Sequence, residues 1–474
     1  MDWKVVLFSI YQVIVILTII HVVLDNRQPA KTMAWALVIW FFPVVGIVFY
    51  IFFGVNTRKE RLISQRSLDM LYKRSMLEFV EQKDLRIPEE YKPIIDLFVS
   101  ENFSLPFRDN EIKIYTDGYT FFPALLREIA SARDHIHIDM YIFEEDALGN
   151  MVRDALIAKA REGVEVRLIY DDVGCWNVRN DFFEQMREEG IEVSPFLPVR
   201  FPSFTSKVNY RNHRKVIVID GRTGFIGGMN IAMRYVKGSN GQSWRDTMLQ
   251  ITGNGVYSLQ KVFLVDWYFV DRNLISNRKY YPRPQEKTEH NESLLQIVTS
   301  GPTSPYSEIM QGYVRMILSA KRYVYIETPY FLPTDPVLFA LKTAAAGGVD
   351  VRVLVPLCSD TKFVEWAGRS YLREIVEAGI VVSYYTAGFL HSKMIVCDDA
   401  ICSCGSTNFD FRSFENNFES NAFVYDPEVA VAMRDMFMDD ISRSLLFTDI
   451  PSRANPNILK RLVESLVRLM SPLM

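Results

Sequence analysis

One short pattern occurs twice in this chain of 474 residues, and it constrains the fold more than any other feature. The first copy reads His213-Arg-Lys215-Val-Ile-Val-Ile-Asp220 and then, after six residues, Gly227-Gly-Met-Asn230. The second copy reads His391-Ser-Lys393-Met-Ile-Val-Cys-Asp398 and then, after six residues, Gly405-Ser406-Thr-Asn408. The separations from His to Lys, Asp, Gly and Asn are the same in both copies. A lone H-x-K carries no information, but two copies at identical spacing indicate two related halves.

Three further segments repeat between the halves. Residues 131–143 resemble 319–331, residues 163–169 match 348–354, and residues 190–196 match 379–385. In each half a helical pattern and a glycine precede a short run of β-branched apolar residues, which is typical of βαβ units. Such units predict a mostly parallel, buried sheet between helices. We therefore expect two tandem α/β/α halves related by pseudo-two-fold symmetry, over residues 109–285 and 286–450.

Two apolar runs precede the repeated region. Residues 5–24 contain few polar side chains, and residues 33–53 contain no charge. Each run is close to the ~20 residues that a helix needs to cross a bilayer. We expect these runs to form a transmembrane helical hairpin within residues 1–56. The alternative is a buried helical hairpin inside a soluble core.

Basic residues around the two runs predict the orientation of this hairpin. The short turn between the runs contains Arg27 and Lys31. Six lysines and arginines follow the second run, between Arg58 and Arg74. Because positive charge accumulates on the cytoplasmic side of membrane proteins, we expect both termini, and with them the large C-terminal part, in the cytoplasm.

Three other segments are predicted more coarsely. Residues 57–108 have the composition of a charged helical linker. Residues 197–211 mix aromatic with basic side chains, so they form either a loop that contacts the membrane interface or a lipid headgroup, or an ordinary surface loop. Residues 451–474 have apolar residues at helical spacing with basic residues between them. We expect an amphipathic helix there, which either lies on the membrane or packs on the rest of the protein.

The repeated pattern suits phosphate chemistry. Alternation along a strand places the His and the Lys of each copy on one face, while the Asp lies at the far end of the strand, where we assign it a structural role. The Asn follows at the end of a second strand, beyond a tight turn, and can reach the same spot. A lysine beside a histidine repels a metal cation, so we expect no metal. Lys and Asn are good donors to phosphate oxygens, and an imidazole is a nucleophile or proton carrier.

Two copies of the pattern around one phosphate predict a two-step displacement. One His attacks phosphorus and the other protonates the leaving oxygen, after which the second His takes a proton from the incoming alcohol. A histidine nucleophile also needs an acid on its other ring nitrogen. We expect Asp246 and Glu419 in this role, since they stand 33 and 28 residues after the His of their own halves, in matching places.

Charge and cysteine content exclude other classes of protein. The net charge of −4 gives no basic field of the kind that attracts nucleic acid. The five cysteines are odd in number and lie mostly in apolar runs, which fits buried thiols in a reducing compartment better than a disulfide framework.

The pair of H-x-K-x-x-x-x-D…G-[GS]-x-N motifs is the signature of the phospholipase D superfamily. The duplicated region, residues 109 to about 445, resembles the catalytic fold of that superfamily. The whole chain is similar to bacterial cardiolipin synthases of the phospholipase D type. The residues that carry this resemblance are the N-terminal hairpin, Asn212-His-Arg-Lys, Phe225-Ile-Gly-Gly-Met-Asn, Thr328-Pro-Tyr-Phe-Leu-Pro and Leu469-Met-Ser-Pro-Leu-Met. Gly228 stands where the superfamily often has Ser, so we expect a hydroxyl contact to phosphate only from Ser406.

The resemblance implies a reaction. Two phosphatidylglycerol molecules give cardiolipin and glycerol without metal, nucleotide or other cofactor, through a phosphatidyl-histidine intermediate. By family analogy His213 is the nucleophile and His391 the acid and base. The implied partners are phosphatidylglycerol, other anionic phospholipids and the membrane, and no nucleic acid. The implied location is a bacterial inner membrane, crossed more than once, with the catalytic part in the cytoplasm. Nothing in the sequence predicts the oligomeric state.

Three alternatives remain open at the level of the sequence. A membrane-bound phospholipase D that hydrolyses or transphosphatidylates other phospholipids is the first. It differs only in the molecule that attacks in the second step, which is water or a lipid hydroxyl. A membrane-tethered nuclease of the same superfamily and a non-catalytic lipid-binding scaffold are the other two. The predicted site residues are the catalytic motif residues His213, Lys215, Asp220, His391, Lys393 and Asp398, the phosphate-binding Asn230, Asn408 and Ser406, and the histidine-orienting Asp246 and Glu419.

Overall fold

The computed structural model describes residues 3–25, 29–54, 87–199, 209–239, 241–275, 277–282, 292–304 and 306–473. The basic cluster after the second apolar run, most of the predicted linker 57–108, most of the loop 197–211 and the predicted boundary at 285/286 lie outside these residues. The chain forms two compact units, one of Met1–Arg61 with Val199–Tyr210 and one of Leu62–Pro198 with Arg211–Met474. We call them the N-terminal unit and the α/β body.

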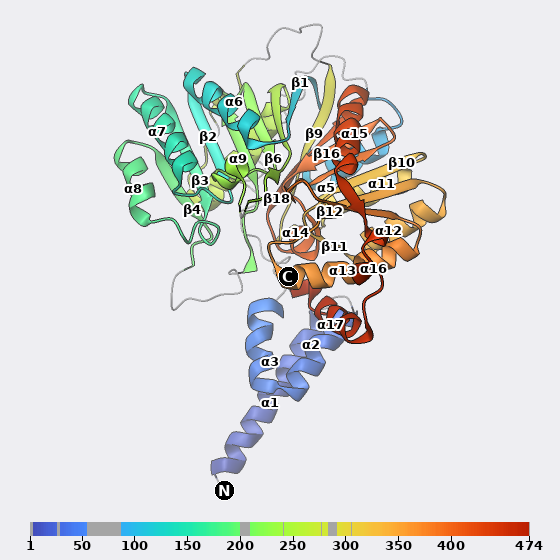
Figure 1. The fold of residues 1–474 in the computed structure, drawn as a ribbon. Helices are drawn as coiled ribbons and strands as arrows, with labels where there is room; N and C mark the ends of the chain where they lie inside the picture. The colour runs from blue at the N-terminus through green and yellow to red at the C-terminus, as the bar shows by residue number, and fades with distance from the viewer. Residues whose placement is uncertain are drawn as a thin grey trace. The chain divides into compact units, whose positions relative to one another are not determined.

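A single sheet runs through the α/β body, and its order shows the duplication directly (Figure 1). In the described part of the chain it has 15 strands. The first half contributes, in spatial order, β1 (Phe107–Tyr115), β8 (Met248–Gly253), β6 (Thr223–Gly227), β5 (Lys215–Ile219), β2 (His135–Met140), β3 (Glu165–Asp171) and β4 (Glu192–Phe196). The second half contributes β9 (Ser293–Ser300), β18 (Glu419–Tyr425), β16 (Ile401–Gly405), β15 (Met394–Cys397), β10 (Tyr323–Glu327), β12 (Asp350–Pro356) and β13 (Val381–Tyr385), with β19 (Ser444–Leu446) at its edge.

The two halves meet where β1 pairs antiparallel with β9. Outward from this seam the strands follow the same order in both halves, so the predicted pseudo-two-fold arrangement is confirmed. The prediction of a mostly parallel sheet is wrong. Only β2, β3 and β4, and likewise β10, β12 and β13, run parallel to one another. The motif hairpins β5–β6 and β15–β16 turn back on themselves through Asp220 and Asp398, and so place antiparallel strands between the parallel strands and the seam.

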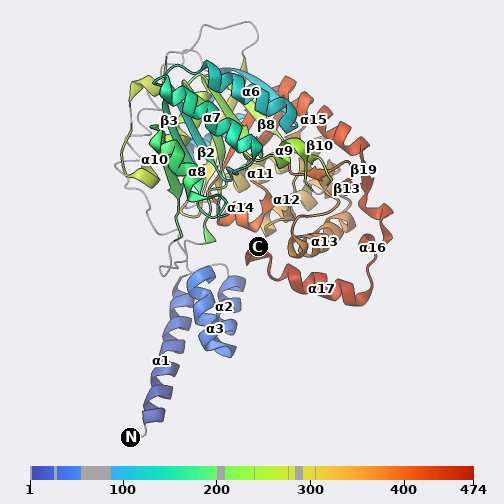
Figure 2. The ribbon, with the colours of Figure 1, turned by 60° about the vertical axis from the view of Figure 1, so that its left-hand side comes forward.

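Helices cover both faces of the sheet (Figures 1 and 2). In the first half α6 (Gly118–Ser131), α7 (Ala147–Arg161) and α8 (Asn180–Glu188) enclose one apolar core. In the second half α5 (Lys92–Asn102), α11 (Glu308–Ser319), α12 (Asp335–Ala346) and α13 (Lys362–Glu377) enclose another. On the opposite face α10 (Val256–Asp271) and α15 (Pro427–Ser442) share a third core, which contains strand residues of both halves. This shared core joins the halves into one body.

Short elements complete the α/β body. They are α9 (Arg234–Lys237), β7 (Trp244–Arg245), the 3₁₀ turn η3 (Arg278–Tyr280), β11 (Phe331–Leu332), β14 (Phe389–Leu390), β17 (Phe409–Asp410), α14 (Phe411–Glu415), η4 (Phe447–Asp449), α16 (Pro451–Ala454), α17 (Ile458–Arg468) and η5 (Ser471–Leu473). The predicted C-terminal helix is therefore present as α17, and it packs on α13 within the same unit.

The N-terminal unit departs from the predicted pair of spanning helices. Its first helix, α1 (Trp3–Leu24), has 22 residues and is long and apolar enough to cross a membrane. The second apolar run is not one helix. It forms α2 (Pro29–Phe41), α3 (Pro43–Phe49) and the π-helical turn η1 (Tyr50–Gly54). Phe42 breaks the run with φ −131° and ψ 63°, and Pro43 removes the N–H that would continue the helix.

The chain reverses direction at this break. The rings of Trp35 and Tyr50 lie 5.6 Å apart, whereas 15 residues of continuous helix would separate them by roughly 22 Å. A Cβ at Gly46 would stand 2.9 Å from the Cα of Ile39, so only glycine allows this close crossing. Among the described residues α1 is thus the one helix long and apolar enough to span a bilayer, so the predicted multi-pass hairpin is not supported.

Candidate active site

Backbone pairing across the two halves builds the site. β14, which directly precedes His391, runs parallel to β7, which directly precedes Asp246. The N–H of His391 donates to the carbonyl of Arg245 at 2.7 Å. In the other half-site the N–H of His213 donates to the carbonyl of Phe418 at 2.9 Å. In both half-sites, the backbone at the histidine therefore pairs with the backbone just before the acid of the other half.

The consequence is an exchange of acids between the halves. Nδ1 of His213 lies 3.0 and 3.1 Å from the two carboxylate oxygens of Glu419. Nδ1 of His391 lies 2.6 Å from Oδ2 of Asp246. The sequence spacing pairs each acid with the histidine of its own half, and in this respect the prediction is wrong. With Nδ1 facing a carboxylate, Nε2 of each ring is the nitrogen left to act on a substrate.

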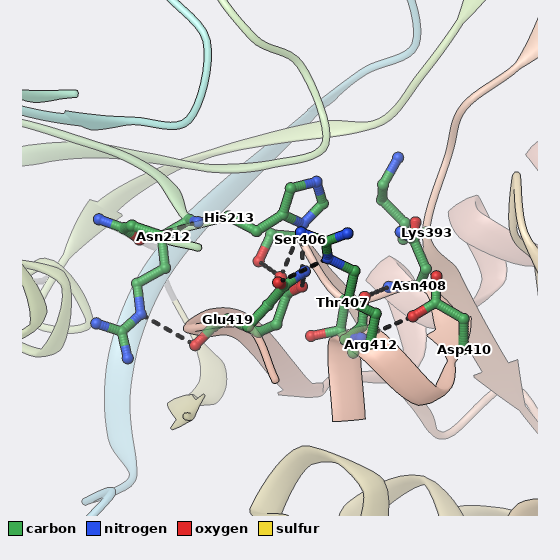
Figure 3. Close-up of polar contacts among 12 residues, drawn as sticks. Asn212, His213, Lys393, Ser406, Thr407, Asn408, Asp410, Arg412 and Glu419 are labelled. Carbon is green, nitrogen blue, oxygen red and sulfur yellow. Dashed lines mark hydrogen bonds and ion pairs between the residues drawn. The ribbon is translucent and has the colours of Figure 1, made fainter. Parts of the chain in front are cut away.

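The two acids are held differently. Oε2 of Glu419 accepts a hydrogen bond from the hydroxyl of Ser406, and Figure 3 shows both side chains beside the His213 ring. Gly228 occupies the matching position beside Asp246, and a Cβ there would stand 2.0 Å from Oδ1 of that carboxylate. The shorter aspartate thus fills the space that a serine side chain takes in the second half. The Ser406 hydroxyl donates to Glu419, and its predicted contact with phosphate stays a prediction.

The lysines and asparagines of the motifs surround the same region. Nζ of Lys215 donates to the carbonyl of His213 at 2.5 Å, and Nζ of Lys393 lies 2.9 Å from Nδ1 of His391. Nδ2 of Asn230 donates to the hydroxyl of Tyr235 at 2.8 Å. Oδ1 of Asn408 is buried and has no hydrogen-bond partner among the described residues, so this oxygen is an available acceptor in the site.

Burial decides the protonation of the histidines. It lowers the pKa of His213 to about 4, against the opposing attraction of Glu419, because an imidazolium is poorly solvated there. Burial and the nearby Lys393 likewise lower the pKa of His391 to about 4. Both imidazoles are therefore neutral at pH 7 before substrate binds, which is the form that a nucleophile needs.

The other charges of the site are coupled across the halves. Burial lowers the pKa of Lys215 to about 7 and lowers that of Lys393 as well. Burial alone would raise a carboxyl pKa, but Lys393 and His391 together hold the pKa of Asp246 below its usual value. His213 and Lys215 do the same for Glu419. Two lysines with lowered pKa values in one buried place favour an anion, whose charge would stabilise their protonated forms.

The two motif aspartates lie away from this cluster, at the opposite end of their strands. The carboxylate of Asp220 accepts hydrogen bonds from the N–H groups of residues 133, 134 and 135 at 2.8–3.0 Å. That of Asp398 accepts from residues 321, 322 and 323 at 2.6–2.9 Å. Each aspartate thereby ties a motif hairpin to the start of the neighbouring parallel strand.

Sequence reasoning did not identify the arginines behind the site. Arg214 donates to the carbonyl of Glu419 at 3.1 Å and pairs with the buried Asp266 of α10. Arg245 donates to Oδ2 of Asp440, on α15, at 2.7 Å. Each arginine is the direct neighbour of a site residue in the sequence, and its charge is balanced by an acid on the helix that covers the shared core. The only signal of these arginines in the sequence is a positive charge directly beside a predicted site residue.

The described residues contain no group of three His, Cys, Asp or Glu side chains arranged to hold a metal ion. The polar groups that the site brings together are two imidazoles, two ammonium groups and amides, which are group types able to attack, protonate and bind a phosphate ester.

Comparison with known proteins decides the family. A sequence model described as cardiolipin synthase, PLD-like domain, matches residues 125–267 and 313–441, which are the two halves. The major cardiolipin synthase ClsA of Bacillus subtilis (strain 168) is 38% identical over 99% of this chain and 99% of its own length. The chain belongs to the cardiolipin synthases of the phospholipase D superfamily. Cardiolipin synthase 2 of Bacillus anthracis is also 38% identical, over 95% of this chain and 88% of that protein.

Other matches agree with the architecture of this cardiolipin synthase family member. A second sequence model, phospholipase D-nuclease N-terminal, matches residues 13–54. The crystal structure of phosphatidylserine synthase from Haemophilus influenzae Rd KW20 superposes with a TM-score of 0.61 over 81% of this chain and all of that one. At 16% identity this likeness concerns the fold alone.

Proposed function

We propose that this protein joins two phosphatidylglycerol molecules to give cardiolipin and glycerol through a phosphatidyl-histidine intermediate. Cardiolipin synthesis, the transfer of a phosphatidyl group, is the activity of the family to which the chain belongs. The observation that supports this mechanism best is the exchange of acids, since Glu419 orients His213 while Asp246 orients His391. A site with two oriented imidazoles has both a nucleophile and a proton carrier.

In the first step Nε2 of His213 attacks the phosphorus of one phosphatidylglycerol. The bond from phosphorus to the glycerol oxygen breaks, and His391, which takes up one proton from solvent when the anionic phosphodiester binds, gives that proton to the oxygen. Glycerol leaves. Lys215, Lys393 and Asn408 stabilise the charge on the phosphoryl oxygens in the transition state, which is where most of the rate enhancement lies.

In the second step a lipid hydroxyl replaces the histidine. His391 takes the proton from the terminal hydroxyl of a second phosphatidylglycerol, whose oxygen attacks phosphorus while the bond from phosphorus to Nε2 of His213 breaks. The product is cardiolipin, and the site returns to its starting protonation. One phosphodiester replaces another, so the reaction is reversible and the amounts of glycerol and lipid set its direction.

The test uses the purified full chain in phosphatidylglycerol liposomes. Equal amounts of cardiolipin and free glycerol are expected, with neither product from His213→Asn or His391→Asn. Added glycerol should convert cardiolipin back to phosphatidylglycerol. Phosphatidic acid without cardiolipin would instead identify a hydrolytic phospholipase D.

We further propose a location for the α/β body, in the cytoplasm beside a cell membrane that α1 crosses once. The pairing of Trp35 with Tyr50 puts the beginning of the second apolar run and its end at the same level. The chain therefore returns to the side on which α1 ends. Lys4 is the only basic residue before the core of α1, whereas Arg27, Lys31 and the later basic cluster all follow it. A single span keeps these charges on the cytoplasmic side and places the N-terminus outside.

This arrangement differs from a two-span hairpin in one measurable way. An epitope added before Trp3 should be accessible to protease from outside intact cells or spheroplasts, while one added after Met474 should be protected. Protection of both epitopes would support the two-span topology instead.

A further inference from the structure

The C-terminal helix α17 is docked with its charged side inward. Glu464 is 1% exposed, and one of its carboxylate oxygens lies 2.6 Å from a guanidinium nitrogen of Arg373 on α13. Arg369, on the same helix, lies 3.6 Å from the other oxygen. Arg468 pairs with Glu374 at 2.5 Å, and its guanidinium stacks 3.8 Å from the ring centroid of Tyr371. These ion pairs fix the rotation of α17 on the α/β body.

The apolar side of α17 faces outward as a result. The exposed side chains on this face, with their exposed fractions, are Leu459 (68%), Leu462 (55%), Val463 (38%), Leu466 (54%), Leu469 (77%) and Met470 (50%). Their spacing of three and four residues forms one continuous stripe along the helix. A surface helix normally buries such a stripe and shows its charges to water. Here the orientation is reversed, so the stripe is built to meet another apolar phase.

The chain end that follows α17 leads back towards α14, the short helix next to the second motif (Figures 1 and 2). The turn η5, which follows α17, contacts α14. α14 begins at Phe411, three residues after the motif residue Asn408, and Asp410 caps its first turn by accepting from the N–H of Ser413 at 2.7 Å. The apolar stripe thus belongs to the same side of the α/β body as the phosphate-binding end of the second motif.

We propose that this stripe, Leu459 to Met470, inserts into the lipid bilayer at the headgroup level and sets the active site against the membrane surface. The lipid surface is the expected occupant because α1 can hold the chain at a membrane. The exposed Arg461 and the half-buried Lys460, which flank the stripe, suit anionic headgroups. The inference deepens the proposed function, on which its functional test rests, because lipid substrates must leave the bilayer to reach two buried histidines.

Insertion can be measured directly. Cys358 is exposed and the other four cysteines are buried, so the full chain with Cys358→Ser accepts a single fluorophore at Leu466→Cys. In phosphatidylglycerol-containing liposomes the fluorophore at position 466 should be quenched by spin-labelled acyl chains. A fluorophore at Arg461→Cys, on the polar side, should be quenched much less. Equal quenching at both positions would overturn the proposal. So would a probe at position 466 that is shielded from both lipid and aqueous quenchers, which would mean that a second copy or another part of the chain covers the stripe.

An activity assay distinguishes an effect on membrane docking from an effect on the chemical step. The double variant Leu462→Ser with Leu466→Ser should lose activity several-fold on liposomes, yet keep it on phosphatidylglycerol dispersed in detergent. Ser465→Ala, an exposed change on the same helix outside the stripe, is the matched control and should keep activity on both. Equal loss on both substrates would contradict a docking role. Quenching at position 466 without cardiolipin formation would leave docking supported and defeat the proposed reaction, so the two can fail separately.

Discussion

Nδ1 of His213 lies 3.0 Å from a carboxylate oxygen of Glu419, although 206 residues separate them and they belong to different halves of the repeat. The reciprocal pair, His391 with Asp246, is 2.6 Å apart. Neither half therefore contains a complete histidine–acid pair. Duplication here is not two sites in tandem but one site divided between two halves.

Removing the charge behind the nucleophile should slow the chemistry. Glu419→Gln keeps the size of the side chain but cannot stabilise an imidazolium or hold the same tautomer, so kcat should fall by about 10²- to 10⁴-fold. Ser406→Ala removes one hydrogen bond to Glu419 and should cost only about tenfold. Glu428→Gln, an exposed change on α15, is the control. Steady-state kinetics on mixed micelles measure all three, and a kcat of Glu419→Gln near that of the control would contradict the orienting role.

Restoring the sequence repeat at Gly228 should harm the enzyme. Gly228→Ser would make the first motif match the second, but its Cβ would collide with Oδ1 of Asp246. The carboxylate must then move away from His391, and activity should drop more than in Ser406→Ala. Circular dichroism and thermal unfolding of the variant establish that it is folded. A fully active Gly228→Ser enzyme would contradict this, because it would mean that Asp246 can move aside and still contact His391.

The pH dependence should follow Lys215 and His213. Burial lowers the pKa of Lys215 to about 7, so this lysine is charged below that pH and loses its charge above it. Phosphodiester binding needs the charge, so kcat/KM, which already declines above about pH 4 because binding must protonate His391, should fall more steeply as the pH rises through about 7. It should also fall as the pH drops through about 4, where His213 becomes protonated and cannot attack.

Lys215→Arg tests the assignment of the alkaline limb. A guanidinium stays charged throughout the accessible range, so the limb should move to higher pH even if the maximal rate is lower. An alkaline limb that does not move would assign it to another group.

Mixing two inactive variants should not restore activity. Full chains with His213→Asn and with His391→Asn each lack one imidazole, and both acids of every site come from the same chain as its histidines. Co-reconstituted in one liposome, the pair should stay as inactive as either variant alone. Recovery of activity would mean that two chains build a shared site.

The motif aspartates should matter for stability and not for the chemical step. Asp398→Ala deprives three backbone N–H groups of their acceptor and should lower the free energy of unfolding by about 1 to 3 kcal/mol. Its kcat per folded molecule should stay near that of the wild type. Urea unfolding and active-site titration together distinguish the two effects, and a large loss of kcat at unchanged stability would place Asp398 in the chemistry.

Much of this fold could be predicted because a repeat of sequence is a repeat of structure. The β5–β6 and β15–β16 hairpins, the pseudo-two-fold relation and the region where His, Lys and Asn meet all follow from local alternation and spacing. The antiparallel majority of the sheet could not be predicted from the βαβ pattern, since the pattern says nothing about which strands the motif hairpins lie beside.

The predictions that were wrong concern contacts between segments far apart in the sequence. The partner of Asp246 is set by pairing of β7 with β14, two-residue strands that carry no signal of their own, and the partner of Glu419 by the single bridge between Asn212 and Phe418. The second apolar run has the length of a spanning helix, but Pro43 and the small Gly46 allow a reversal that hydropathy does not register. The hydrogen bond from Ser406 to Glu419 could not be predicted because the sequence does not show that these side chains meet.

The most direct test of the account is to identify the atom that carries the phosphatidyl group during turnover. The full chain, turning over an ether-linked phosphatidylglycerol, is rapidly quenched, digested and analysed by mass spectrometry. A single phosphatidyl group is expected on the peptide that contains His213, together with exchange of labelled glycerol into phosphatidylglycerol, and both signals should vanish in His213→Asn. A phosphatidyl group on the His391 peptide, or cardiolipin formation with neither adduct nor exchange, would contradict it.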